Sequence, residues 1–312
     1  MSVRLRNERL VVTLATIPSR VSKIRPVIDS IKAQTRKPDQ IYICICKFCA
    51  WEQSSYDVPE WLAEDGEVQL VVSRRDYGPA NKLLSMLHEE PNPATRIVIV
   101  DDDWSYNPDM LEVLQERFEH YQRCAIGSSG ARLPRKWSVM EARIGPEIHA
   151  TPQMRHHLIF VAESPEDHVV DILQFGFGAM VLREWFDDDI YDLVQPLEPL
   201  YFSDDVMFSG YLESKGVKRV CVSGMPLPRL LDHWNVRPLH GEGRATRNYK
   251  AAIPEISSTL NIWSPETLFN PPRPPALSVL KYWALRAIRK AHRVAIRPLL
   301  RRAGLPAVRE RK

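Results

Sequence analysis

Three consecutive carboxylates, Asp101, Asp102 and Asp103, directly follow the apolar run Ile-Val-Ile-Val at residues 97–100. A short β-branched run of this kind predicts a buried strand of a parallel sheet. Open α/β sheets bind their ligands at the carboxyl ends of such strands. Three acids there repel one another unless a cation neutralises them, and oxygen ligands suit Mg²⁺ or Mn²⁺ beside a diphosphate. The sequence therefore predicts a metal–phosphate site, with a solvated acidic turn as the alternative.

A second pair of acids, Asp204 and Asp205, stands about a hundred residues later, before a helical pattern at residues 206–212. Ser203 is placed to cap that helix, and acids in a first turn are favoured by the helix dipole. The pair is therefore explained by helix capping alone. Combined with the first acid cluster, it instead predicts a general base.

The chain alternates apolar strand patterns with helical patterns. Strands are predicted near residues 10–16, 40–46, 67–72 and 96–101, and helices near 20–34, 79–89 and 107–121. This order predicts an α/β fold with a mostly parallel sheet. Beyond residue 123 the pattern is mixed, with strands predicted near 157–162, 168–174 and 218–222 and helices near 182–187 and 204–215.

Several segments, taken in order, resemble one family. They are residues 11–20 (VVTLATIPSR), 40–45 (QIYICI), 76–82 (DYGPANK), 101–103 (DDD), 176–179 (GFGA) and 203–205 (SDD). Over about residues 9–250 the chain resembles the GT-A fold glycosyltransferases of the inverting family-2 type. In that comparison, residues 101–103 match the Asp-x-Asp motif, and residues 176–179 match a small-residue segment before an acceptor-side helix.

The resemblance implies a Rossmann-like, mixed and mostly parallel sheet flanked by helices. It also implies transfer of a hexosyl or deoxyhexosyl group from a nucleotide-sugar donor, with inversion, to a hydroxyl of a glycan or lipid-linked acceptor in polysaccharide or glycolipid synthesis. Asp101 and Asp103 would hold Mn²⁺ or Mg²⁺, and Asp102 would be the variable middle acid. Asp205 would be the catalytic base, with Asp204 the less favoured candidate.

The resemblance also suggests a donor site. Its candidate residues are Thr13, Thr16, Arg20, Arg75, Asp76, Lys82 and Asp101. Lys82 is equally well explained as a solvated helix lysine. His240, in a Gly-containing loop, is the candidate that completes the metal site, and His233 is its competitor.

Two other functional classes stay open. One is a non-catalytic glycan- or nucleotide-binding protein on a degenerate GT-A fold, which the intact acids at positions 101, 103 and 205 disfavour. The other is a nucleotidyltransferase, which also uses strand-end carboxylates and a metal. That class normally carries a Gly-rich basic loop near the first strand, and residues 15–20 (ATIPSR) contain no glycine.

Composition and cysteine usage are typical of a globular protein in a reducing compartment. The 312 residues are 44% hydrophobic and 26% charged. The five cysteines show no disulfide pattern and are predicted to be buried thiols, although a Cys-x-Cys-x-x-Cys metal site is the alternative. We find no secretory h-region and no run of about 18 apolar residues, and we therefore expect a cytoplasmic protein.

The C-terminal segment differs from the rest of the chain in charge. Residues 273–312 carry twelve Lys and Arg residues against one acid, a net charge of +11, so residues 1–272 carry −8, because the whole chain carries +3. We expect a catalytic domain over residues 1–269, a Pro-rich linker at 270–275 and a basic amphipathic helical tail at 276–312. Such a helix suits an anionic membrane surface, which predicts a peripheral protein on the cytoplasmic face. Packing of the tail on the acidic body and a nucleic-acid-binding arm are the alternative interpretations. We favour the membrane surface and expect no nucleic-acid partner.

Overall fold

The computed structural model describes residues 8–121, 123–133, 159–236 and 244–263. The chain divides into two units, Met1–Pro271 and Pro272–Lys312, and all described residues belong to the first. The predicted linker at 270–275 and tail at 276–312 therefore lie outside the described residues, as does His240. None of the described helices is both long and apolar enough to cross a bilayer.

The main sheet has eight strands among the described residues, in the order β3-β2-β1-β4-β11-β6-β12-β9. In that order they are Val68–Ser73, Gln40–Cys46, Leu10–Ala15, Arg96–Val100, Phe177–Leu182, Cys124–Gly127, Lys218–Cys221 and His168–Val170. Strands β3, β2, β1 and β4 are parallel, β11 runs antiparallel to both of its neighbours, β12 is parallel to β6, and β9 closes the sheet antiparallel to β12. The predicted α/β class is thus confirmed, as the mixed, largely parallel sheet that the GT-A resemblance implies.

Two small sheets accompany the main one. One joins β10 (Ile172–Leu173), β7 (Ser129–Arg132) and β8 (Ile159–Ala162), and the other joins β13 (Arg229–Leu230) to β5 (Trp104–Ser105). The β13–β5 pair returns the chain from the end of β12 to the segment just after the three aspartates.

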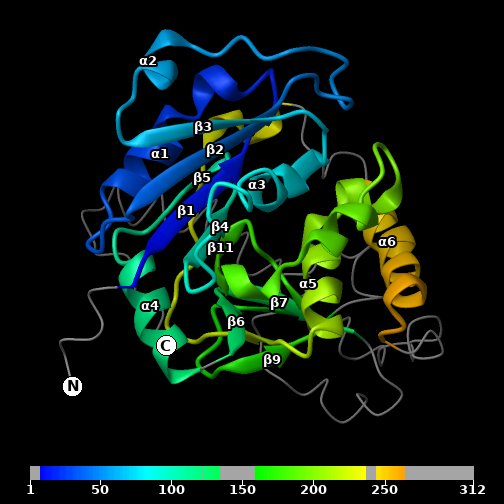
Figure 1. The fold of residues 1–312 in the computed structure, drawn as a ribbon. Coiled ribbons are helices and arrows are strands. Elements are labelled where there is room, and N and C mark those ends of the chain that lie inside the picture. Colours follow the sequence, from blue (N-terminus) through cyan, green and yellow to red (C-terminus); the bar gives the residue numbers. More distant parts are fainter. Residues whose placement is uncertain (1–7, 122, 134–158, 237–243, 264–312) are drawn as a thin grey trace, which may run out of the picture. The chain divides into compact units, whose positions relative to one another are not determined.

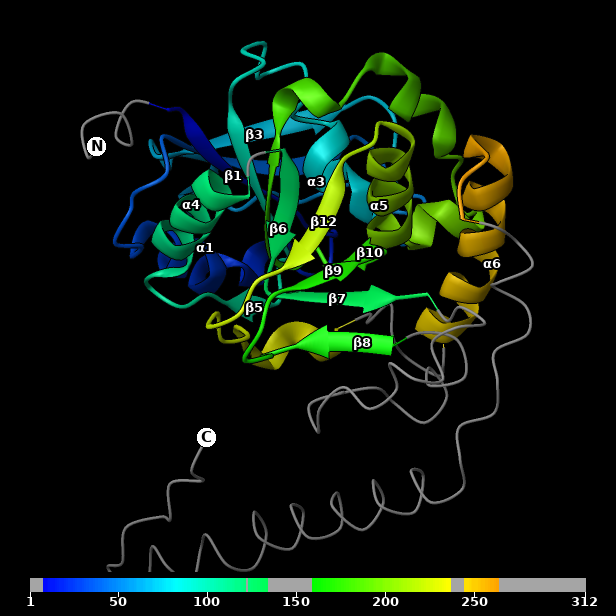
Figure 2. The ribbon, with the colours of Figure 1, turned by 90° about the horizontal axis from the view of Figure 1, so that it is seen from below.

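Helices cover both faces of the main sheet (Figures 1 and 2). The α-helices are α1 (Arg25–Lys32), α2 (Glu60–Ala63), α3 (Asn81–Leu84), α4 (Met110–His120), α5 (Asp204–Ser214) and α6 (Arg244–Leu260). The short 3₁₀ helices span Val21–Lys23, Gly78–Ala80, Arg183–Trp185, Asp188–Leu193, Pro199–Phe202 and Asp232–Asn235. Helices α1 and α4 lie together on one face, where the Gln34 side-chain oxygen, two residues after α1, accepts a hydrogen bond from the Leu111 N–H at 3.0 Å. Helices α3 and α5 lie on the other face, and α6 packs outside α5 (Figure 1).

The first four predicted strands are confirmed to within a residue at most ends. The residues of the Ile97–Val100 segment are fully buried, as expected for a central strand covered on both faces. The predicted helix at 20–34 is instead a 3₁₀ turn followed by α1. Pro26 is the reason for the break, because proline lacks the N–H that a continuous helix needs and is tolerated only in a first turn.

The sequence-based prediction lacks five of the described strands, β5, β6, β7, β11 and β13, and two of the described α-helices, α2 and α6. Strands β6, β7 and β11 are rich in glycine, alanine and serine, which have low strand propensity. The segment expected to precede an acceptor-side helix, residues 176–179, instead opens β11 in the middle of the sheet. The predicted strand at 168–174 splits at Asp171, so that β9 and β10 join different sheets.

The prediction of buried thiols is confirmed for four cysteines, Cys44, Cys46, Cys49 and Cys221, whereas Cys124 is half-buried. All five are free. Burial raises the pKa of the Cys44 thiol to about 12, so this group stays protonated and behaves as a small apolar side chain.

Candidate functional site

The carboxyl ends of β1 and β4 form the topological switch point of the parallel half-sheet. The chain runs outward from β1 to β2 and β3, then returns to the other side of β1 as β4. Ligands of open α/β sheets bind in the crevice outside such a point. The loop after β1 and the three aspartates after β4 both emerge there (Figure 1).

Asp102 joins these two loops. Its carboxylate accepts a hydrogen bond from the Thr16 hydroxyl at 2.6 Å and pairs with the Arg20 guanidinium at 2.7 Å. All three side chains are buried. Thr16 and Arg20, predicted as donor-binding residues, are therefore placed at the switch point, and the middle acid ties the loops together.

The backbone of Asp101 is held through the Tyr106 hydroxyl to Gly176, the residue before β11. The Tyr106 hydroxyl accepts a hydrogen bond from the Asp101 N–H at 2.8 Å and donates one to the Gly176 carbonyl at 2.6 Å. A Cβ atom added at Gly176 would lie 1.9 Å from Oδ2 of Asp101, well inside any real contact. Only glycine therefore allows the Asp101 carboxylate to occupy this place.

Lys82 on α3 links the two acid groups. Its ammonium forms ion pairs with Asp101 and, at 2.8 Å, with Asp204, and only 3% of the residue is exposed. Burial opposes ionisation, but the two carboxylates outweigh it and raise the pKa of Lys82 above its ordinary value. The alternative of a solvated helix lysine is therefore wrong. Thr13, another predicted donor residue, donates its hydroxyl to the Lys82 carbonyl and is fully buried beneath the site.

Both carboxylate oxygens of Asp205 accept a hydrogen bond. Oδ1 accepts the Phe175 N–H at 2.8 Å, and Oδ2 accepts the Tyr249 hydroxyl at 2.9 Å. Burial, together with the neighbouring Asp204 carboxylate, raises the pKa of Asp205 to about 8. Ser203 occupies the N-cap position of α5 but makes no side-chain cap hydrogen bond, so the acids do not depend on it.

Asp103 is the least satisfied of the three strand-end acids. Its backbone carbonyl accepts the Leu231 N–H at 2.9 Å, and Oδ2 lies 3.4 Å from the Arg20 guanidinium. Oδ1 is buried and has no hydrogen-bond partner among the described residues. Burial, with the Asp102 and Asp101 carboxylates, raises the pKa of Asp103 to about 7. A buried carboxylate oxygen of this kind is costly without a cation.

His233 reaches the same loop from the other half of the chain. One ring nitrogen, Nε2, lies 2.7 Å from the Asp102 carbonyl oxygen, which identifies that nitrogen as the donor. The predicted competitor of His240 is thus brought to the acid loop.

The donor chemistry of Asp103 fits a divalent cation, although the described residues form no larger metal-binding group. The part of the chain that the structure describes has no group of three or more His, Cys, Asp or Glu side chains placed to hold a metal ion. Mg²⁺ and Mn²⁺ sites commonly use only one or two carboxylates, with water and substrate phosphates completing the shell. The unpartnered oxygen of Asp103 matches that donor chemistry, whereas Asp101 already carries the Lys82 ammonium.

Two predicted donor residues have other partners in the structure. The Asp76 carboxylate accepts four hydrogen bonds, which come from the Ala50 and Gly78 N–H groups, the Asn81 amide and the Tyr201 hydroxyl. Arg75 donates to the carbonyls of Tyr191 and Val194. These contacts are those of structural residues, and the donor-binding role of both stays a prediction.

Sequence reasoning missed Tyr106 and Tyr249 as parts of the site, and it singled out residues 176–179 without placing Gly176 against Asp101. The Tyr106 hydroxyl binds backbone groups of Asp101 and Gly176, and the sequence carries no signal for such a contact. Tyr249 lies on α6, and recognition of the helical pattern over residues 244–260 would have placed it on a helix but not beside Asp205.

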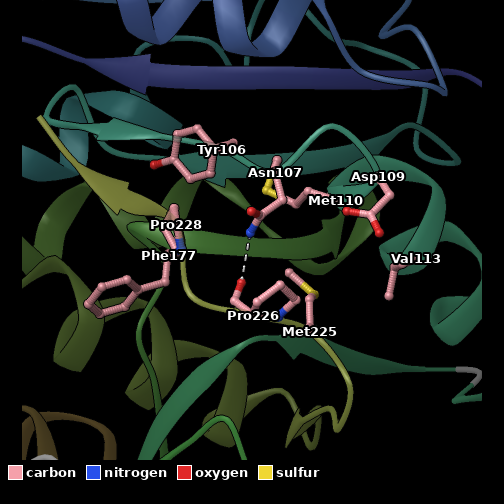
Figure 3. Close-up of a pocket in the computed structure, with 9 residues that line it drawn as sticks. All are labelled: Tyr106, Asn107, Asp109, Met110, Val113, Phe177, Met225, Pro226 and Pro228. Atoms are coloured by element: carbon pink, nitrogen blue, oxygen red, sulfur yellow. Dashed lines mark hydrogen bonds between the residues drawn. The ribbon is translucent and has the colours of Figure 1, made fainter. Parts of the chain in front are cut away.

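Tyr106 also lines an apolar pocket (Figure 3). Its lining includes Met110, Phe177, Met225 and Pro228, and an Asn107 amide donates to the Pro226 carbonyl at 3.0 Å across it. Phe177 also packs on Trp104, with the ring centroids 4.9 Å apart. Asp109 is the only acid in the lining, so the pocket itself offers no acid pair for chemistry.

Comparisons with known proteins give little beyond a fold likeness. No protein-family model and no curated protein matches the chain. Among solved structures, the chain is similar to the crystal structure of residues 1–349 of TarS from S. aureus in complex with UDP, with 11% identity and a TM-score of 0.46. The match covers 80% of this chain and 64% of the TarS chain. A likeness of this degree carries no argument about activity.

Proposed function

We propose that this protein is an inverting, metal-dependent glycosyltransferase that moves a sugar from a nucleotide-sugar donor to a hydroxyl of a glycan or lipid-linked acceptor. One observation carries the proposal. Two acid groups about a hundred residues apart, at 101–103 and 204–205, meet through the buried Lys82 beside the switch point of the sheet. Buried and half-buried carboxylates gathered at a ligand-binding edge favour chemistry over structural support.

The donor would bind at the ends of β1 and β4. Thr16 and Arg20 lie there with Asp102, and Asp103 would hold Mn²⁺ or Mg²⁺ through its unpartnered oxygen, with Asp101 next to it. The ion, when bound, would neutralise the negative charge that grows on the leaving diphosphate. Arg20 adds a permanent positive charge at the same edge.

Asp205 is the better candidate for the base. The Asp204 carboxylate is already paired with the Lys82 ammonium at 2.8 Å. Each carboxylate oxygen of Asp205 accepts one hydrogen bond, which leaves a lone pair on each oxygen for a substrate proton. In the reaction the acceptor oxygen attacks the anomeric carbon, the bond to the diphosphate breaks, and the acceptor proton passes to Asp205.

The test is a panel of nucleoside diphosphate sugars screened for thermal stabilisation with and without Mn²⁺. We expect at least one donor to raise the melting temperature of the wild type in a Mn²⁺-dependent manner. Asp103→Ala removes that dependence, whereas Asp188→Ala, an exposed acid on a 3₁₀ helix, keeps it. No stabilisation by any donor, or an unchanged response in Asp103→Ala, contradicts the proposal.

Association with an anionic membrane through residues 276–303 is a second part of the proposal. It is supported by the charge division of the sequence, +11 against −8. Each basic residue near an anionic surface contributes on the order of 1 kcal/mol. Full-length protein with Arg289, Lys290 and Arg293 changed to Glu should lose co-sedimentation with phosphatidylserine vesicles. Equal sedimentation of both proteins contradicts this part alone.

A further inference from the structure

We infer that Tyr249 on α6 is a positioning residue for Asp205, whose hydroxyl fixes the orientation of the carboxylate and favours its ionised, proton-accepting form. The inference rests on the proposed role of Asp205 as the base. Tyr249 itself is not proposed to touch a reacting atom. Its function is to make one oxygen of the base point in a fixed direction.

The geometry shows a carboxylate held from two sides. The Phe175 N–H, in the turn between β10 and β11, donates to Oδ1 at 2.8 Å. The Tyr249 hydroxyl donates to Oδ2 at 2.9 Å from a separate helix. One donor on each oxygen fixes both the position and the plane of the carboxylate, which is the preorganisation that a general base needs.

The charges around Asp205 explain why such a donor matters. Burial and the carboxylates of Asp204 on α5 and Asp101 after β4 oppose its ionisation, whereas the ammonium of Lys82 on α3 and the Phe175 N–H favour it. A hydroxyl that donates to the charged form favours ionisation further. The pKa of Tyr249 is raised well above its ordinary value by burial and by Asp205, so the hydroxyl keeps its proton and stays a donor.

Helix α6 holds the tyrosine in place by close packing on α5. A Cβ atom at Gly210 of α5 would lie 2.6 Å from the Ile256 side chain of α6, so the two helices approach at a glycine. Ile256 and Ala252 are fully buried in this contact. The packing of α6 therefore does not depend on the Tyr249 hydroxyl, and Tyr249→Phe removes the hydrogen bond while it keeps the ring.

The first experiment follows the ionisation of Asp205 without a substrate. The difference in unfolding free energy between the wild type and Asp205→Asn, measured across pH, reports the pKa of Asp205 in the folded protein. We expect Tyr249→Phe to move the midpoint of this difference upward by about one pH unit, since a hydrogen bond to a charged group is of that size or larger. Tyr211→Phe is the matched control, because the buried Tyr211 hydroxyl donates to a different carboxylate, Asp189, and this variant should leave the midpoint unchanged.

A near-isosteric replacement covers the case in which Tyr249→Phe does not fold. Replacement of Tyr249 by 3-fluorotyrosine makes the hydroxyl a stronger donor and should move the midpoint downward. A midpoint that is unmoved in the folded variants overturns the inference.

Kinetics separate this inference from the proposed function. With a donor from the panel, Tyr249→Phe should keep donor affinity and shift the acidic limb of the pH–rate profile upward. If Asp205→Asn is inactive and Tyr249→Phe has the wild-type profile, the inference fails and the function stands. If Asp205→Asn is fully active, the proposed base itself is wrong.

Discussion

Replacement of Lys82 by methionine should destabilise the protein far more than the loss of an ordinary surface lysine. Methionine keeps the length and apolar stem of the side chain and removes the charge. The buried carboxylate of Asp204 and the carboxylate of Asp101, whose side chain is 37% exposed, then face no Lys82 ammonium. Removal of one partner from a buried ion pair leaves an uncompensated charge in a medium of low dielectric.

The expected magnitude follows from burial. Breaking a buried ion pair costs about 3–5 kcal/mol. For a domain of this size, 1 kcal/mol corresponds to a change of roughly 2–4 °C in melting temperature, so we expect a decrease of roughly 6–20 °C. Addition of Asp204→Asn to Lys82→Met should restore part of the loss, because the double variant has one unpaired carboxylate fewer.

Lys32 provides a matched control. It also bridges two carboxylates, Asp65 at 2.7 Å and Glu67 at 2.8 Å, but Glu67 is 73% exposed. Surface pairs contribute about 0–1 kcal/mol, so Lys32→Met should lower the melting temperature by a few degrees at most. Thermal unfolding followed by circular dichroism compares the variants. Equal effects of Lys82→Met and Lys32→Met refute the buried-bridge argument.

Three further predictions concern the site itself. Gly176→Ala should lower the free energy of unfolding by about 1–3 kcal/mol through overpacking and impair the site, because its Cβ would lie 1.9 Å from the Asp101 carboxylate. Gly66→Ala is the control, since nothing lies within 4 Å of its Cβ, and it should be neutral or stabilising when both variants are compared by urea unfolding. Asp103→Ala should abolish Mn²⁺-dependent binding of a nucleoside diphosphate in calorimetry, and retained metal dependence in the folded variant argues against Asp103 as the ligand. Wild-type kcat/KM should rise with pH to a midpoint near 8, because burial and a neighbouring carboxylate raise the pKa of Asp205 to about 8 and only the ionised form accepts a proton. A midpoint near 4 contradicts the assignment of Asp205 as the base.

The sequence predicted the parts of the fold that follow from local pattern. The apolar run at 97–100 specified a buried strand, and the alternation of patterns before residue 121 specified the parallel half-sheet. Strand β11 was missed because Gly176 and Gly178 are typical of turns. The structure explains both glycines by close approach, since Gly176 makes room for Asp101, and a Cβ at Gly178, with φ +96°, would lie 2.6 Å from the Met110 sulfur.

The candidate site was predictable as a set of residue types but not as a network. The acids at 101–103 and 204–205 stand out in the sequence, yet the link between them depends on where α3 lies in the folded chain. For the same reason the pattern left Lys82 open between a donor residue and a solvated lysine. Tyr249 approaches Asp205 only because α6 packs on α5, which is a tertiary contact that no local spacing encodes.

The central claim is that Asp205 takes the proton of the acceptor while the donor binds elsewhere at the same edge of the sheet. Its most direct test is the affinity of Asp205→Asn for the identified donor, measured by calorimetry, beside its turnover. We expect wild-type affinity with turnover lowered by about a hundredfold or more, as for removal of a general base. Full turnover in a folded Asp205→Asn protein contradicts it.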